Sequence, residues 1–187
     1  MNTSETPGKT PGENATPLVA AIVHSEHGTA DGLLADFAFG LRERGWRVHG
    51  LVQQEKDGRG KAATMLVDLD SGQCFALFQR LGPGSGSCSL DSTSVTASSV
   101  VLRRALEQRP DLAVANRFGA LEASGAGLAT EMLALAAAGI PLLTVVSDEY
   151  LPRWRSVIGH CGAELPPEMQ ALQNWFARVS QPREQTS

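Results

Sequence analysis

The chain has 187 residues, of which 42% are hydrophobic, 19% are charged and 5% are aromatic. This length and composition fit one globular domain with an ordinary hydrophobic core. The formal net charge of -4 provides no basic field of the kind that binding to a phosphate backbone requires. We therefore expect no nucleic-acid partner.

The apolar segments and the two ends of the chain indicate a cytoplasmic protein without a membrane partner. The longest apolar runs, 18–23 and 133–138, fall far short of the roughly 20 residues that cross a bilayer. The first 17 residues have no apolar stretch typical of a secretory signal, so we expect disordered tails over 1–17 and 180–187 around a single domain over 18–179. The three cysteines lack C-x-x-C spacing, which favours free thiols.

The first half of this domain predicts a strand, a helix, a second strand and a hairpin. Residues 18–23 form a continuous apolar run, which is typical of a strand covered on both faces. Apolar residues then recur at helical spacing over 33–45, and this segment ends with cations and a glycine. A second strand is expected over 47–52, and strands over 64–69 and 74–78 are expected to pair with each other.

The second half alternates helices with strands. A helix is expected over 92–109, a buried strand over 112–116, a helix over 128–138 and a strand over 140–146. Apolar residues on one face of 169–179 predict a closing helix. Helices between strands indicate a parallel sheet, so we expect an α/β three-layer sandwich with the hairpin inserted after the second strand.

Ligands of such sheets bind at the carboxyl ends of the strands, where helix N-termini converge. The loop 24–31 after the first strand has the position of a phosphate-binding loop, which needs the pattern Gly-x4-Gly-Lys-[Ser/Thr]. The lysine of that pattern bridges phosphates, and its hydroxyl holds magnesium. An ungapped alignment puts Ala30 at the lysine and Asp31 at the hydroxyl, so the sequence predicts a degenerate P-loop.

The segment 116–127 reads Asn-Arg-Phe-Gly-x-x-Glu-x-x-Gly-x-Gly, and 82–91 reads Gly-x-Gly-Ser-x-x-Cys-x-Leu-Asp. Both patterns resemble those of an uncharacterised bacterial family associated with molybdate-uptake genes. The order of elements over about 18–165 is also similar to that of small thermophile P-loop nucleoside-triphosphatases. The resemblance implies a P-loop-NTPase-like fold. In those enzymes an acidic pair orders magnesium and water where this chain has Asn116 and Arg117.

Three side chains near the end of strand 112–116 are candidates for a site. Arg117 can clamp an anion through its fork of donors, or it can form a structural pair with Glu122. Asn116 can bond the backbone of the turn or contact a ligand. Glu122 is the candidate catalytic residue, because the resembled enzymes use such a glutamate to order water.

The remaining candidates lie in the loop 24–31, in the segment 116–127 and in the Gly/Ser-rich segment 82–89. Neutral hydroxyls and backbone N–H groups suit a compact oxyanion, and glycines let the backbone approach a ligand. For the Gly/Ser-rich segment, the structural alternative is a flexible connector. For Asp31, it is a helix N-cap or a first-turn residue that the helix dipole favours. Histidines in the first loop can bind a transition metal, although we assign no metal. The residues are His24, His27, Gly28, Thr29, Asp31, Ser85, Ser87, Cys88, Gly119 and Gly125.

The sequence therefore favours a protein that binds a phosphate-like anion or a nucleotide, with little or no catalysis. The resemblance suggests a link to molybdate or tungstate. One alternative is a genuine nucleoside-triphosphatase with an altered loop, and only that alternative requires magnesium. The other is a protein-interaction module that uses the surfaces of Trp154 and Trp175. The oligomeric state, including a homo-oligomer, stays open.

Overall fold

The computed structural model describes residues 16–25, 29–55, 64–80 and 88–180. Both predicted tails lie almost wholly outside these residues, and so do four of the candidate site residues, namely His27, Gly28, Ser85 and Ser87. The side chains of Thr29 and Cys88 also lie outside the description.

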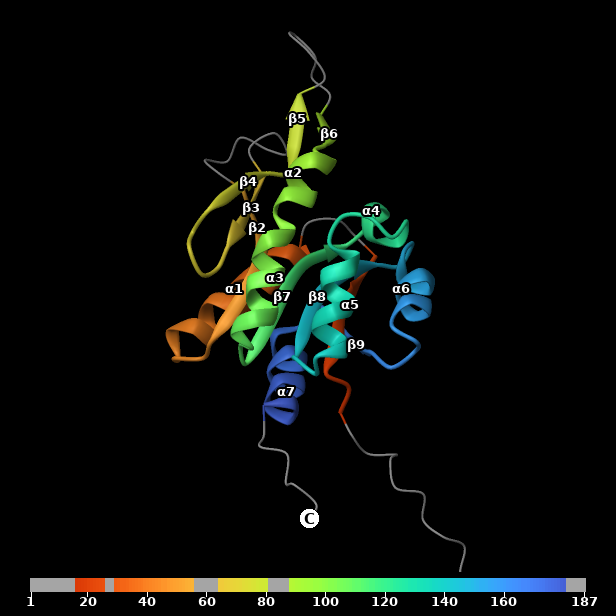
Figure 1. Ribbon diagram of the computed structural model, residues 1–187. Coiled ribbons are helices and arrows are strands. Elements are labelled where there is room, and N and C mark those ends of the chain that lie inside the picture. Colours follow the sequence, from red (N-terminus) through yellow and green to blue (C-terminus); the bar gives the residue numbers. More distant parts are fainter. Residues whose placement is uncertain (1–15, 26–28, 56–63, 81–87, 181–187) are drawn as a thin grey trace, which may run out of the picture.

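A sheet of seven strands forms the middle layer of the molecule, with the strand order β4-β3-β2-β7-β8-β1-β9 (Figure 1). Five neighbouring strands run parallel, and β3 and β4 form an antiparallel hairpin beside β2. The predicted mostly parallel sheet with an inserted hairpin is therefore confirmed. The strands are β1 (Val19–His24), β2 (Val48–Glu55), β3 (Thr64–Asp68), β4 (Cys74–Ala76), β7 (Leu112–Phe118), β8 (Leu142–Ser147) and β9 (Ala163–Leu165).

Helices cover both faces of the sheet, which confirms the three-layer architecture (Figure 1). On one face, α1 (Thr29–Glu43) packs beside α7 (Met169–Val179), and the rings of Phe37 and Phe176 meet edge to face with centroids 6.2 Å apart. The other face carries α3 (Ser99–Gln108), α5 (Ala129–Ala137) and α6 (Leu151–Val157). Each face has its own buried apolar cluster, because the parallel strands are apolar on both sides.

Several elements differ from the sequence prediction. The predicted helix over 92–109 is two helices, α2 (Ser92–Ala97) and α3, which meet at Ser98. The Ser98 hydroxyl is buried and donates to the carbonyl of Val95 at 2.7 Å, a local bond that competes with a continuous helix. Three short elements have too few residues for a periodic signal: α4 (Ala120–Ala123), α6 and β9.

The predicted strand over 74–78 is also divided. Its first part is β4, and its last residue begins β5 (Phe78–Arg80), which pairs with β6 (Cys88–Leu90) as a separate antiparallel sheet. The predicted Gly/Ser loop therefore ends in a strand. Figure 1 shows β5, β6, α2 and α4 at the end of the molecule to which the carboxyl end of β7 points.

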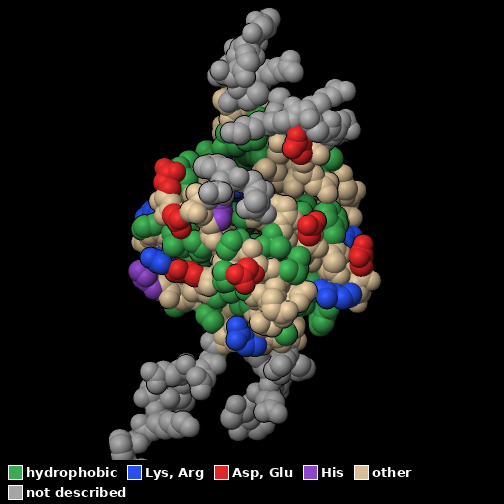
Figure 2. Space-filling view, turned by 180° about the vertical axis from the view of Figure 1, so that it is seen from behind, with side chains coloured by type: hydrophobic (Ala, Val, Ile, Leu, Met, Phe, Trp, Pro, Cys, Tyr) green, Lys and Arg blue, Asp and Glu red, His purple; other side chains and the backbone are tan. Residues whose placement is uncertain are grey.

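The surface gives no support to the predicted tryptophan contacts with a partner protein. Trp154 and Trp175 are both 0% exposed, because they fill the cores on opposite faces of the sheet. On the face shown in Figure 2, acidic and basic side chains are intermixed. The helices in the described part of the chain are all too short or too polar to cross a membrane.

Candidate functional site

A cavity of about 650 Å³ lies at the carboxyl end of β7. This volume is within the range of small-molecule binding sites. The polar or charged residues of its lining come from β2, β3, α1, β7 and the α4 region, and the apolar ones come mainly from the hairpin, β5, β6 and α2. The lining residues are Asp31, Gly32, Gln53, Glu55, Thr64, Leu66, Leu77, Phe78, Leu90, Val95, Asn116, Arg117, Gly119, Ala120, Leu121, Glu122, Leu128 and Tyr150.

An irregularity in β7 brings two consecutive side chains to this cavity. Ala115 lies opposite Thr144 of β8 and Arg117 lies opposite Val145, so Asn116 is an extra residue in the strand. Consecutive residues of a regular strand point to opposite faces, whereas a β-bulge changes the direction of a side chain. Asn116 and Arg117 consequently both line the cavity.

Arg117 forms an ion pair with Asp31, which lies in the first turn of α1. The Nη2 atom of Arg117 is 2.5 Å from Oδ2 of Asp31, and the two side chains are 23% and 7% exposed. Of the two alternatives for Arg117, the structural pair with Glu122 is therefore wrong. Asp31 is a first-turn residue and not the N-cap, since α1 begins at Thr29.

Two oxygen atoms at this end of the cavity have no hydrogen-bond partner among the described residues. They are Oδ1 of Asp31 and Oδ1 of Asn116, and both are buried. Most buried polar atoms in folded proteins are hydrogen-bonded, and an unsatisfied one costs about 1–3 kcal/mol. Among the described residues, these two acceptors therefore lack a protein partner.

Glu122 is bonded to the backbone at both of its carboxylate oxygens. Oε2 accepts from the N–H of Gly119 at 3.0 Å, and Oε1 accepts from the N–H of Leu128 at 3.1 Å. The first bond is half of a capping box at the N-terminus of α4, and the second ties this helix to the start of α5. Glu122 therefore has a structural role that its predicted catalytic role did not include.

Gly125 and Gly127 lie in the turn that connects α4 to α5, next to Glu122 in the sequence. Gly127 has a φ of +57°, and a Cβ atom there would lie 2.3 Å from Oε1 of Glu122. Gly125 has a φ of +84° but does not line the cavity. The Glu-x-x-Gly-x-Gly part of the sequence pattern is explained by a tight turn around one buried carboxylate.

The structure brings together only some of the predicted site residues. Asp31, Asn116, Arg117, Gly119 and Glu122 all line the cavity. His24 does not: it is buried at the end of β1, opposite Ser147.

Sequence reasoning missed the apolar wall of the cavity. Leu66 comes from β3, Leu77 from the link between β4 and β5, Phe78 from β5, Leu90 from β6 and Val95 from α2. A wall of this kind suits a planar or apolar part of a ligand. The inserted hairpin was the available signal, because it follows the strand end at Gln53–Glu55 that also lines the cavity.

A magnesium ion, which the resembled enzymes hold, does not fit the described residues. The strand end that would supply an acidic pair has Asn116 and Arg117, and the guanidinium of Arg117 binds the carboxylate of Asp31. A cation beside that guanidinium would be repelled. Groups of three or more His, Cys, Asp or Glu side chains able to hold a metal are also absent from the described part of the chain.

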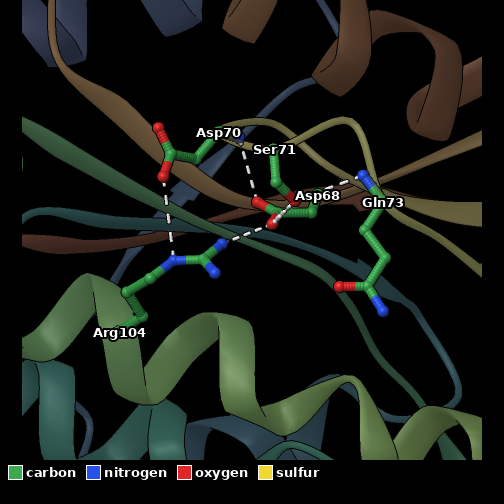
Figure 3. A network of polar contacts seen from close by, with 5 residues as sticks. All are labelled: Asp68, Asp70, Ser71, Gln73 and Arg104. Carbon is green, nitrogen blue, oxygen red and sulfur yellow. Dashed lines mark hydrogen bonds and ion pairs between the residues drawn. The ribbon is translucent and has the colours of Figure 1, made fainter.

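A second aspartate–arginine pair lies outside the cavity, between the hairpin and α3 (Figure 3). Asp68 is fully buried and accepts hydrogen bonds from the Ser71 hydroxyl, from the Asp70 N–H and from Arg104. Burial raises the pKa of Asp68, but the three hydrogen bonds and the charge of Arg104 outweigh it, so that the pKa lies below its ordinary value. This pair fastens the hairpin to α3.

Sequence comparison shows a family and a longer relative. Residues 19–175 match the family described as "Protein of unknown function (DUF2478)". The chain is also 38% identical, over 164 residues, to the molybdenum import ATP-binding protein ModC 2 of Bradyrhizobium diazoefficiens. That match covers 87% of this chain but only 18% of the relative, so the chain spans about a fifth of the relative's length.

Structural comparison shows the fold of small nucleoside-triphosphatases. A human cancer-related nucleoside triphosphatase matches with a TM-score of 0.58 at 17% identity, covering 90% of this chain and 99% of the other. THEP1 from the hyperthermophile Aquifex aeolicus matches with a TM-score of 0.59 at 9% identity, covering 86% and 95%. The predicted P-loop-NTPase-like fold and the predicted family resemblance are both confirmed.

Proposed function

The chain belongs to the DUF2478 family, and from this premise we propose that it binds a nucleotide in the cavity at the carboxyl end of β7 and hydrolyses it weakly or not at all. The observation that carries the proposal is the Asp31–Arg117 ion pair. It joins the first turn of α1 to the end of β7, inside a cavity of nucleotide size. The binding unit is the single α/β domain expected over 18–179.

A nucleotide fits the cavity better than a bare oxyanion does. The volume of about 650 Å³ is far larger than a tetrahedral anion needs, and the wall of Leu66, Leu77 and Phe78 offers an apolar surface to a base. The structural relatives are nucleoside triphosphatases, and the longer relative is an ATP-binding protein of molybdenum import. We therefore propose that the predicted link to molybdate or tungstate concerns the process in which the protein acts, and that neither anion is the ligand of this cavity.

In the proposal, Arg117 supplies the positive charge for a phosphate group. Asp31 occupies one guanidinium nitrogen of Arg117 and thereby orients the fork of donors, while the other nitrogens have no bond to a described residue. The N-terminus of α1 adds backbone N–H groups and the helix dipole. We propose Gly28, Thr29, Ser85 and Ser87 as the neutral donors, with Cys88 beside them.

The expected lack of hydrolysis has three physical reasons. A lysine that would bridge the phosphates is replaced by Ala30 in the ungapped alignment, and an acidic pair is replaced by Asn116 and Arg117. The third reason is that both oxygens of Glu122 already accept a backbone N–H, which leaves this carboxylate poorly placed to order a water.

The proposal is tested by isothermal titration of the full chain with ATP, GTP, phosphate, molybdate and tungstate. We expect saturable binding of a nucleotide and a loss of at least about tenfold in affinity in Arg117→Ala, since a charge-assisted contact is removed. Arg103→Ala is the matched control, because Arg103 pairs with Glu131 at the surface, outside the cavity. Well-folded protein that binds none of the five compounds would end the proposal.

Hydrolysis is measured on the same protein as magnesium-dependent phosphate release from ATP and GTP. We expect no release above the level of Glu122→Gln. Release that is abolished in Glu122→Gln, while α4 and the fold stay intact by circular dichroism, would instead establish a nucleoside-triphosphatase.

A further inference from the structure

We propose that Gln53 and Thr64, on the hairpin side of the cavity, recognise the polar edge of the nucleotide's base. The inference rests on the proposed nucleotide binding and names the side chains that hold the base in the same site. The chemistry that they fit is a base edge on which an N–H donor lies beside an acceptor. Guanine offers such an edge with N1–H beside O6, and adenine with its amino group beside N1.

The strand order separates the apolar side of the cavity from its charged side. Leu66 lies on β3, Gln53 on β2 and Arg117 on β7, and these strands are successive neighbours in the sheet. Neighbouring strands are about 4.8 Å apart, so β3 lies roughly 10 Å from β7. A nucleoside triphosphate separates its base from its outer phosphates on a similar scale. A phosphate at Arg117 therefore directs the base toward β3, past Gln53.

The register of the hairpin puts the side chains of Gln53 and Thr64 on the face that lines the cavity. Gln53 lies opposite Leu66 in the antiparallel pair of β2 and β3, and both of them line the cavity together with Thr64. The alternate pair, Gln54 and Met65, is absent from the lining. Successive side chains of a strand point to opposite faces, so this alternation is what side chains directed at the cavity produce.

Both side chains have polar groups that are available to a ligand. Neither the amide of Gln53 nor the hydroxyl of Thr64 forms a hydrogen bond to another described residue, although Thr64 is only 6% exposed. An amide offers a donor and an acceptor side by side, and a hydroxyl offers either, which matches a base edge of mixed polarity. Leu66 beside Gln53, together with Phe78, supplies apolar surface for the ring of the base.

The test uses nucleotides that share the sugar and the phosphates but differ at the base edge. The affinities of GTP, ATP and purine riboside 5′-triphosphate for the full-length wild-type protein are measured by isothermal titration. Purine riboside keeps the ring but has no exocyclic group, so part of the polar edge is lost. We expect it to bind about tenfold more weakly than the better of GTP and ATP, because the amide of Gln53 loses a partner. GTP and ATP distinguish the two edges.

Substitutions connect this discrimination to the hairpin. Gln53→Leu keeps a similar volume but removes the amide, and it should reduce the difference to about threefold or less. Thr64→Val removes the hydroxyl alone and should reduce it by a smaller factor. Gln54→Leu is the matched control and should keep the full difference, because Gln54 is the next residue of β2 and does not line the cavity. Affinity for inorganic tripolyphosphate should change less than about twofold in all three variants, since none of them alters a phosphate contact.

Purine riboside triphosphate that binds as tightly as GTP and ATP, with a dependence on Arg117, would overturn this inference and leave the proposed function standing. A discrimination that Gln53→Leu retains in full, or a loss of tripolyphosphate binding in that variant, would also overturn it. No binding of any nucleotide by folded wild-type protein would remove the proposed function and this inference together. The comparison of ligands on the wild type decides the matter even where Gln53→Leu does not fold.

Discussion

The Asp68–Arg104 pair and the Asp31–Arg117 pair have the same chemistry but differ in how completely their carboxylates are bonded. Both oxygens of Asp68 accept hydrogen bonds, from a backbone N–H, a serine hydroxyl and Arg104 (Figure 3). Within the described residues, Oδ2 of Asp31 accepts from Arg117, whereas Oδ1 is buried and has no hydrogen-bond partner. The first pair is explained by the fold alone, whereas the second leaves one acceptor without a partner among the described residues and has both of its side chains in the lining of the cavity.

The largest expected effect comes from breaking the saturated pair. Asp68→Ala removes an acceptor shared by Ser71, Asp70 and Arg104, so we expect a loss of about 3 kcal/mol in the free energy of unfolding. Urea unfolding monitored by circular dichroism measures it. Nucleotide affinity in the same variant should be unchanged below the unfolding transition; a variant as stable as the wild type would refute the structural role.

Acid should weaken the same pair. The pKa of Asp68 is lowered in the folded protein, so its stabilising contribution is complete above about pH 4, the ordinary value for aspartate. It is lost as the pH falls through the lower folded pKa. Unfolding free energies of wild type and Asp68→Asn should therefore converge as the pH drops below about 4, and a gap that widens there would contradict this.

A smaller effect on stability is expected at the half-saturated pair. Asp31→Asn removes the charge that faces Arg117 but keeps an oxygen that can accept from it, and the Arg117 side chain is 23% exposed, so we expect a smaller loss in the free energy of unfolding than for Asp68→Ala, on the order of 1–2 kcal/mol. Thermal unfolding without ligand measures this. A loss as large as that of Asp68→Ala would mean that Asp31 is chiefly structural.

The smallest effect is expected for a surface pair. Arg103 and Glu131 connect α3 and α5 at 2.9 Å, and the Arg103 side chain is 57% exposed. Arg103→Ala should change the free energy of unfolding by at most about 0.5 kcal/mol, because solvent screens such pairs. Raised salt should hide even that difference in urea unfolding, which makes the variant a baseline for the other two pairs.

The long-range layout of the fold was predictable because the short apolar runs over 18–23, 112–116 and 140–146, separated by helical patterns, are typical of parallel strands that are buried on both faces. The parallel strands also predicted that the site lies at their carboxyl ends, and the cavity lies at the carboxyl end of β7. Asn116, Arg117 and Asp31 were recognised as candidates, and they do line the cavity.

The partners of these side chains were not predictable. Arg117 binds Asp31, which is 86 positions away in the sequence, and no local pattern encodes that contact. The bulge at Asn116 depends on the register of β7 against β8. The pattern around Glu122 also does not predict that the backbone N–H groups of Gly119 and Leu128 donate to its two carboxylate oxygens; its catalytic role stays a prediction. Such roles follow from tertiary packing.

The most direct test is a calorimetric titration of the wild-type chain and Arg117→Ala with GTP and ATP, with phosphate release followed in the same samples. We predict saturable binding of at least one nucleotide by the wild type, weaker binding by Arg117→Ala, and little or no release of phosphate. No binding of either nucleotide by folded wild-type protein, or steady release of phosphate from it, would contradict the account.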